Sequence, residues 1–238
     1  MGMLGVQFAE LARDLETGAP GSRERVEVLV QARNAYSAAG ASRVLADYKS
    51  RRGLFQEALR ASNSGLTRLA TARAKGRASD DLRAALTVER GLAFAGLGQV
   101  DQALSVHDEL GKSHARYDGL AIGRFRICFL AATRVGEFPD ALQIFQMRAE
   151  SLELDAREEL MGEVLAAVEG DGDEQDRARL AEKLRSQPML SLWLRVAAPG
   201  LEGELTPIIV PALSGAVPRI GLSDLDPDSV LPKFASRE

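Results

Sequence analysis

Residues 98–104 read Gly-Gln-Val-Asp-Gln-Ala-Leu, and the same pattern returns as Gly-Leu-Phe-Gln-Glu-Ala-Leu at 53–59 and Gly-Glu-Phe-Pro-Asp-Ala-Leu at 136–142. Glycine stands first in every copy, phenylalanine or valine third, and Ala-Leu last. Each copy lies where one helix-periodic stretch stops and another starts, which is typical of stacked helical hairpins. We expect such a stack to present a long concave surface to a partner.

Apolar residues recur at helical spacing through most of the first 187 residues, which predicts an all-α fold. Short connections force neighbouring helices to lie antiparallel, so we expect a right-handed superhelical array of about five antiparallel hairpins. The expected helices span residues 4–16, 23–39, 42–51, 55–74, 79–97, 100–114, 120–135, 138–154, 157–169 and 173–187. Ser79 is the expected N-cap of the fifth helix.

The character of the chain changes near its end, which suggests an array over residues 1–196 and a tail over 197–238. The tail holds six of the nine prolines, so no long helix is expected there. It is also apolar, unlike low-hydrophobicity segments that stay disordered. We therefore predict an extended tail docked on the array or on a partner, through Ile208, Ile209, Val210 and Leu213.

The three copies resemble the turn between the two helices of the tetratricopeptide repeat. The middle copy matches best, through Gly91, Phe94, Gly98, Val100, Ala103 and Leu110. The resemblance covers residues 40–155. It departs from the family in the spacing of the copies, 45 and 38 residues instead of about 34, and in the missing closing proline.

In that family, the first helix of each repeat lines a concave groove. Carried over by register from each glycine, the resemblance implies a groove of basic ends and an apolar middle. Its residues are Arg43, Asp47, Ser50, Arg51, Val88, Leu92, Ala95, Arg126, Leu130, Thr133 and Arg134. Such a surface suits an extended or helical peptide with apolar anchors and acidic flanks. The alternative, that these arginines are a solvated helix face, stays open.

The family's clamp for a C-terminal carboxylate needs lysine and asparagine at particular groove positions. This chain has Asp47, Glu89, Gly123 and Ile127 there, so such a clamp is not expected. The sequence predicts a non-catalytic adaptor, assembly chaperone or regulatory subunit of a complex. A regulator or sensor that binds a signalling peptide or nucleic acid is the alternative, and an enzyme subunit with catalysis supplied in trans is a third. A homo-oligomer also remains open.

Net charge is −4 over 238 residues but is divided unevenly. Residues 1–148 carry 21 basic and 16 acidic residues, and residues 149–238 carry 9 and 18, so the two parts have net charges of +5 and −9. The basic stretch from Arg43 to Arg90 lacks aromatics spaced to stack on bases, so nucleic-acid binding is not the first expectation. We find no membrane span or secretory signal and expect a cytoplasmic protein.

No catalytic set, cofactor motif or metal site is expected. His107 and His114 lack further ligands at suitable spacing. Asp171, Asp173 and Glu182 fall at calcium-loop spacing, but Asp176 stands where glycine is required and the stretch reads as helix. Cys128, between apolar neighbours, is expected to be a buried structural thiol. The sequence therefore favours a binding protein over an enzyme.

Overall fold

The computed structural model describes residues 3–113, 115, 117–148, 151–169, 174–186, 194, 197 and 198. Within these ranges the chain forms ten α-helices and no strand, so the predicted all-α class is confirmed. It divides into two compact units, residues 1–131 and 132–238. The predicted docking residues Ile208, Ile209, Val210 and Leu213, and with them the tail beyond residue 198, lie outside the described residues.

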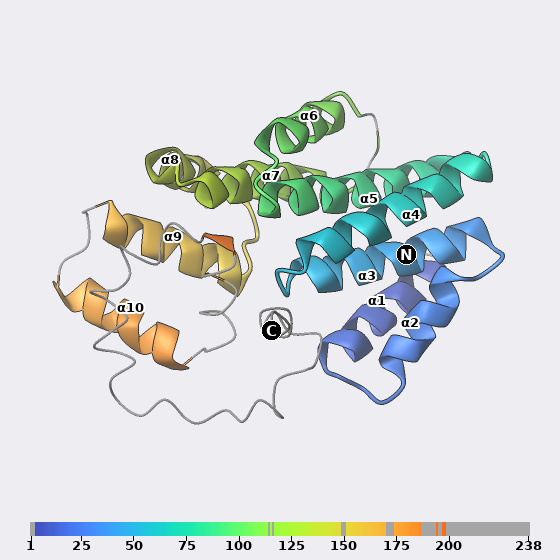
Figure 1. Ribbon diagram of the computed structural model, residues 1–238, viewed down its shortest axis with the longest axis horizontal. Coiled ribbons are helices and arrows are strands. Elements are labelled where there is room, and N and C mark those ends of the chain that lie inside the picture. The colour runs from blue at the N-terminus through green and yellow to red at the C-terminus, as the bar shows by residue number, and fades with distance from the viewer. Residues whose placement is uncertain are drawn as a thin grey trace, which may run out of the picture. The chain divides into compact units, whose positions relative to one another are not determined.

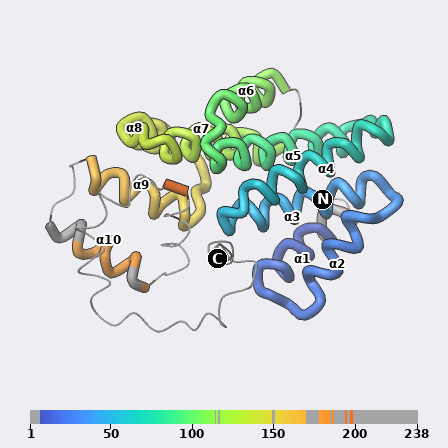
Figure 2. The backbone as a smooth tube through the Cα atoms, viewed as in Figure 1, coloured from blue at the N-terminus to red at the C-terminus, as the bar shows by residue number. Residues whose placement is uncertain are grey.

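The first unit holds six complete helices and most of a seventh. These are α1 (Met3–Glu16), α2 (Ser22–Val30), α3 (Ala35–Ser50), α4 (Phe55–Thr71), α5 (Arg77–Gly96), α6 (Val100–Gly111) and α7 (Leu120–Val135), the last of which ends beyond the boundary. Helices α3, α4 and α5 lie side by side (Figure 1), and α3 contacts both of the others. Connections of three to five residues join consecutive helices from α1 to α6 (Figure 2), which holds them together as hairpins.

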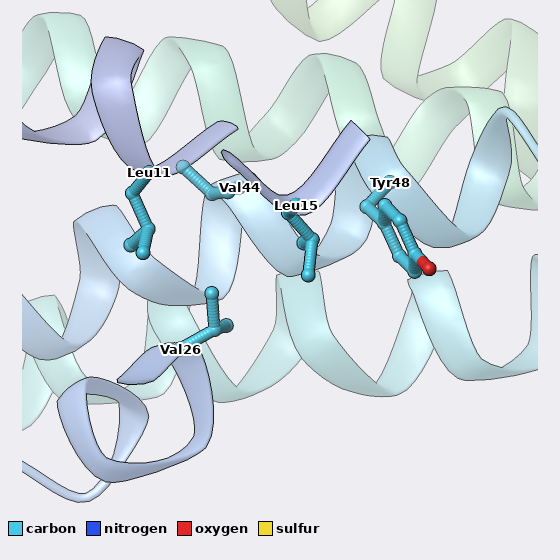
Figure 3. Packing of buried hydrophobic residues seen from close by; sticks show 5 residues of the cluster. All are labelled: Leu11, Leu15, Val26, Val44 and Tyr48. Atoms are coloured by element: carbon cyan, nitrogen blue, oxygen red, sulfur yellow. The ribbon is translucent and has the colours of Figure 1, made fainter. Parts of the chain in front are cut away.

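The core of the first hairpins is a cluster of large apolar side chains from three helices. Leu11 and Leu15 of α1 meet Val26 of α2 and Val44 and Tyr48 of α3 (Figure 3). All five are buried, and half-buried apolar side chains pack around them. Burial of this kind contributes about 1.5–3 kcal/mol for each large apolar side chain, so the cluster fixes α1 and α2 against α3.

The second unit contains α8 (Phe138–Arg148), α9 (Ala156–Val168) and α10 (Glu174–Ser186), in which α9 contacts both neighbours. Asp155 caps α9, because its carboxylate accepts hydrogen bonds from Arg157 and Glu158 N–H while the Glu158 carboxylate accepts one from Asp155 N–H. This reciprocal cap satisfies backbone donors at the start of the helix. It also marks where the chain leaves the connection after α8.

The three glycine-containing copies form the same turn in the structure. Gly53, Gly98 and Gly136 have φ angles of 71°, 73° and 86°. In each turn the next residue donates its N–H to a carbonyl five positions back: Leu54 to Lys49, Gln99 to Phe94, and Glu137 to Ala132. This geometry ends a helix and favours glycine, which has no Cβ to clash. Later in each copy, Ala58, Ala103 and Ala141 are fully buried, as expected at close helix contacts.

The requirement for a positive φ angle at these turns can be measured at Gly136. An added Cβ would meet no atom within 4 Å there, so a substitution tests the backbone conformation without a steric clash. We expect Gly136→Ala to destabilise the fold by about 1–2 kcal/mol, because a left-handed conformation is strained for alanine. Gly136→Asn should cost less, since asparagine tolerates this region. Thermal unfolding of the two variants, followed by circular dichroism, tests this order. Equal melting temperatures for Gly136→Ala and the parent chain would contradict it.

Two predicted helix boundaries are wrong. The chain breaks at residues 31–34, not at 40–41, because the Asn34 side chain accepts hydrogen bonds from Tyr36 and Ser37 N–H and starts α3 there. Gly40 lies inside α3, where the Phe8 ring fills the space that a Cβ would need. Helix α5 begins at Arg77 after Gly76, so Ser79 lies within its first turn and does not cap it. Packing of Phe8 against Gly40 allows α3 to continue through that glycine, and the backbone turn at Gly76 sets the start of α5.

Three helices also end earlier than expected. Helix α4 ends at Thr71, α6 at Gly111 and α8 at Arg148, whereas the predicted ends were 74, 114 and 154. Residues 152–155 belong to no helix, because Asp155 is already the cap of α9. The remaining predicted boundaries agree with the structure to within one or two residues.

Candidate functional site

A row of charged side chains lies along one face of α3. Arg43, Asp47 and Arg51 are spaced four residues apart, so they follow one another on the helix surface. Arg51 Nε donates to Asp47 Oδ1 at 2.9 Å, and its Nη1 donates to Glu16 Oε1 of α1 at 3.0 Å. Arg43 Nη2 makes a long contact of 3.5 Å with the Tyr117 hydroxyl oxygen, which comes from the connection between α6 and α7.

A buried carboxyl group of α5 faces this row. Glu89 is only 4% exposed, and its Oε2 has no hydrogen-bond partner among the described residues. Burial raises the pKa of Glu89 to about 8, and the negative charge of Asp47 adds to the rise, while Arg43, Arg51 and Arg126 act in the opposite direction. The carboxyl group is therefore mostly protonated at pH 7. We call Arg43, Asp47, Arg51, Glu89, Tyr117 and Arg126 the inner cluster.

Glycines bring α5 and α7 close enough to form the inner cluster. A methyl group at Gly123 of α7 would lie 2.6 Å from Val88, and one at Gly91 of α5 would lie 2.5 Å from Ile127. Val88 of α5 thus faces Gly123 of α7, and about one turn later on both helices Gly91 faces Ile127. Glu89 and Arg126 each lie next to a member of these pairs, so their charges interact across the two helices.

Four of the predicted groove residues belong to the inner cluster: Arg43, Asp47, Arg51 and Arg126. The others are placed differently. Ser50, Val88, Ala95 and Leu130 are buried, and Leu92 is half-buried. Thr133, which is buried, and Arg134, whose pKa burial lowers, fall in the second unit. Val88 fills the space beside Gly123, so its side chain contributes to helix packing.

Sequence reasoning missed the roles of Glu89 and Tyr117. Residues 84–96 are apolar or neutral except for Glu89 and the adjacent Arg90, so Glu89 is the one carboxylate of this stretch. A lone acid within such a run is a detectable signal, because burying it has a large free-energy cost. Tyr117 lies in a connection between helices, where helical register assigns no position.

In the part of the chain that the structure describes, other reactive side chains do not gather into a second site. Within the described residues, no group of three or more His, Cys, Asp and Glu side chains is placed to hold a metal ion. His107 lies beside Asp108 on α6, and His114 falls outside the described positions. Cys128 is half-buried, and burial raises its pKa, which disfavours the reactive thiolate.

An open depression of about 390 Å³ lies at the turn between α4 and α5. Arg73, Lys75 and Arg83 line it together with Asp80. Arg83 donates to both Asp80 Oδ1 and the Ala74 carbonyl oxygen, so part of its charge is already used within the protein. No aromatic side chain lines the depression, so a platform for stacking bases is missing from it.

None of the helices in the described part of the chain is both long enough and apolar enough to cross a bilayer. Comparison with protein-family models, with curated proteins and with solved structures finds no match. The residues of this chain are thus the basis for assigning its function.

Proposed function

We propose that this protein is a non-catalytic adaptor or regulatory subunit that binds a peptide or helix of a partner protein on its stacked hairpins. The single observation that supports this most is the inner cluster. Its charged side chains come from three successive first helices of hairpins, α3, α5 and α7, or from the connection that precedes α7. A protein that only needed a stable core gains little from such a cluster, because burying charge is costly.

The arrangement fits a superhelical array like that of the tetratricopeptide repeat. The first helices of adjacent hairpins contact one another, as α1 does with α3 and α3 with α5. Such rows of first helices form the surface on which arrays of this type bind extended partners. The recurring glycine turns and fully buried alanines support the same proposal.

The partner we propose is a peptide or helix with apolar anchors and acidic flanks. Arginine recognises carboxylates through paired, charge-assisted hydrogen bonds. Arg43 and Arg126 lie on different helices and are both close enough to Glu89 to influence its ionisation. A peptide laid across α3, α5 and α7 would therefore meet positive charge at both edges of the cluster.

Affinity capture from a lysate of the native organism tests the proposal. The parent chain is expected to retain a defined partner, and the double variant Arg43→Gln/Arg126→Gln should retain it at least ten-fold less. The matched control is Arg60→Gln/Arg68→Gln, which removes two arginines exposed on α4. Circular dichroism must show that both variants keep their helices.

Equal loss of the partner in both double variants would show that general charge, not the inner cluster, governs binding. Retention on heparin that declines steeply with salt, without a captured protein, would favour nucleic-acid binding in place of the adaptor proposal.

A further inference from the structure

We propose that the inner cluster binds a carboxylate of an acidic side chain of the partner, which accepts hydrogen bonds from the Arg43 guanidinium and from the Glu89 carboxyl group. This inference rests on the proposed function and specifies the chemical group that the inner cluster recognises. The ligand carboxylate takes the position beside Arg43 that the Tyr117 hydroxyl occupies in the structure.

Two buried polar groups indicate what the ligand must supply. Arg43 Nε and Glu89 Oε2 are both buried without a hydrogen-bond partner among the residues that the structure describes. Unsatisfied polar groups of this kind are rare and costly in native proteins. With the carboxyl group of Glu89 protonated, both groups can donate a hydrogen bond. The missing partner is therefore an acceptor, and a carboxylate provides two acceptor oxygens.

Charge balance favours an anion over a cation. Asp47 is paired with Arg51, which also pairs with Glu16, so the positive charge of Arg51 is already matched by two carboxylates of the protein. Protonation of Glu89 leaves the positive charge of the Arg43 guanidinium beside it. An ammonium or guanidinium ligand would be repelled by Arg43, whereas a carboxylate would be attracted.

The Tyr117 hydroxyl makes only a weak contact with the Arg43 guanidinium. Its hydroxyl oxygen is 3.5 Å from Arg43 Nη2, at the outer limit for a hydrogen bond. A charge-assisted bond between a guanidinium and a carboxylate is shorter and stronger. Displacing the Tyr117 hydroxyl therefore exchanges a poor contact for a good one.

Binding in this way is linked to the protonation of Glu89. The charged and titratable groups that face it are Arg43, Asp47 and Arg51 of α3, Arg126 of α7 and Tyr117. Burial raises the pKa of Tyr117 above its ordinary value of 10, so its hydroxyl stays protonated in the range where Glu89 titrates. An incoming carboxylate cannot lie beside an ionised Glu89 without repulsion. Affinity should therefore fall as pH rises through the pKa of Glu89.

The experiment uses three end-blocked decapeptides as probes. They share an alternating alanine framework and carry glutamate, glutamine or lysine at the remaining positions. Binding to the full chain is measured by isothermal titration calorimetry from pH 6.5 to 9.5, in two buffers of different ionisation enthalpy. We expect the glutamate peptide alone to bind, with affinity declining by up to about ten-fold per pH unit above pH 8. Proton uptake should accompany binding in that range.

Variants at Glu89 separate the effect of the hydrogen bond that its carboxyl group donates from the effect of its titration. Glu89→Gln keeps a donor but cannot titrate, so it should bind the glutamate peptide with little dependence on pH. Glu89→Met removes the donor and should weaken binding at pH 7 by about 10- to 100-fold, as should Arg43→Gln. Tyr117→Phe removes the hydroxyl that the ligand must displace from Arg43, so it should raise the affinity.

The inference is overturned if the glutamine or lysine peptide binds as well as the glutamate peptide, or if Glu89→Gln retains the pH dependence of the parent chain. Such a result would leave the adaptor proposal standing wherever a captured partner is lost in Arg43→Gln/Arg126→Gln. Conversely, selective and pH-dependent binding of the glutamate peptide would support the carboxylate site even if capture yields no partner.

Discussion

Glu89→Gln should be more stable than the parent chain at pH 9, by on the order of 4 kcal/mol, and nearly equal to it at pH 5. The parent chain buries a carboxyl group whose pKa is about 8 in the folded state and 4.5 when exposed. Glutamine has nearly the same shape and never ionises. The substitution therefore removes the free-energy cost of burying a charge without leaving a cavity.

The direction of this change in stability with pH follows from the number of protons that the folded and unfolded chains bind. Between pH 4.5 and 8 the folded chain holds a proton on Glu89 that the unfolded chain has lost. The contribution of Glu89 to stability is therefore fully present below pH 4.5 and is lost as pH rises through 8. Urea unfolding of both proteins at pH 5, 7 and 9, followed at 222 nm, measures the difference. Curves for the two proteins that stay parallel over this range would show that Glu89 is already ionised at neutral pH.

Phe55→Ala should destabilise the first unit by about 3–5 kcal/mol, since the phenylalanine of the first glycine-containing copy is a core residue. Phe55 is 4% exposed, and its ring occupies the space next to Gly96 of α5 that a Cβ would need. Removing the ring leaves a cavity between α4 and α5. Glycine at position 96 has no side chain that could move to fill it.

The matched control for Phe55→Ala is Val100→Ala, at the same position of the second copy. Val100 is half-buried and smaller, so its replacement should cost about 1 kcal/mol. Chemical unfolding of the two variants at one pH gives the comparison. Similar losses in both would mean that the Phe55 ring contributes little beyond the general pattern of the turn.

The fold class could be predicted because helical periodicity and glycine turns are local signals. Gly53, Gly98 and Gly136 adopt positive φ, and at each of them the preceding helix ends and the following helix begins within one residue of the predicted limit. The start of α3 could not be placed correctly, because two signals compete there. Asn34 caps the helix locally, and Gly40 is tolerated inside it only because Phe8 from α1 packs over it. That contact joins residues far apart in sequence.

The candidate site was partly predictable for a similar reason. Register from the glycine turns identified Arg43, Asp47, Arg51 and Arg126, which the structure gathers around Glu89. On α5 the same register pointed to Val88, one residue before Glu89. One residue corresponds to about 100° of rotation around a helix, so a small difference in repeat length changes which neighbours a side chain faces. Repeats spaced 45 and 38 residues apart cannot share a single register.

The contact between Tyr117 and Arg43 has a mechanical consequence. In a linear stack, each hairpin contacts only its immediate neighbours. The energetic coupling between two hairpins therefore weakens with their distance along the stack. The connection that leads into α7 reaches back past α5 to α3, bridging 74 positions of the chain. This contact joins the second hairpin directly to the start of the fourth, but at 3.5 Å it is easily broken. A ligand that displaces the Tyr117 hydroxyl would therefore break this direct link, and the second and fourth hairpins would then be coupled through the third.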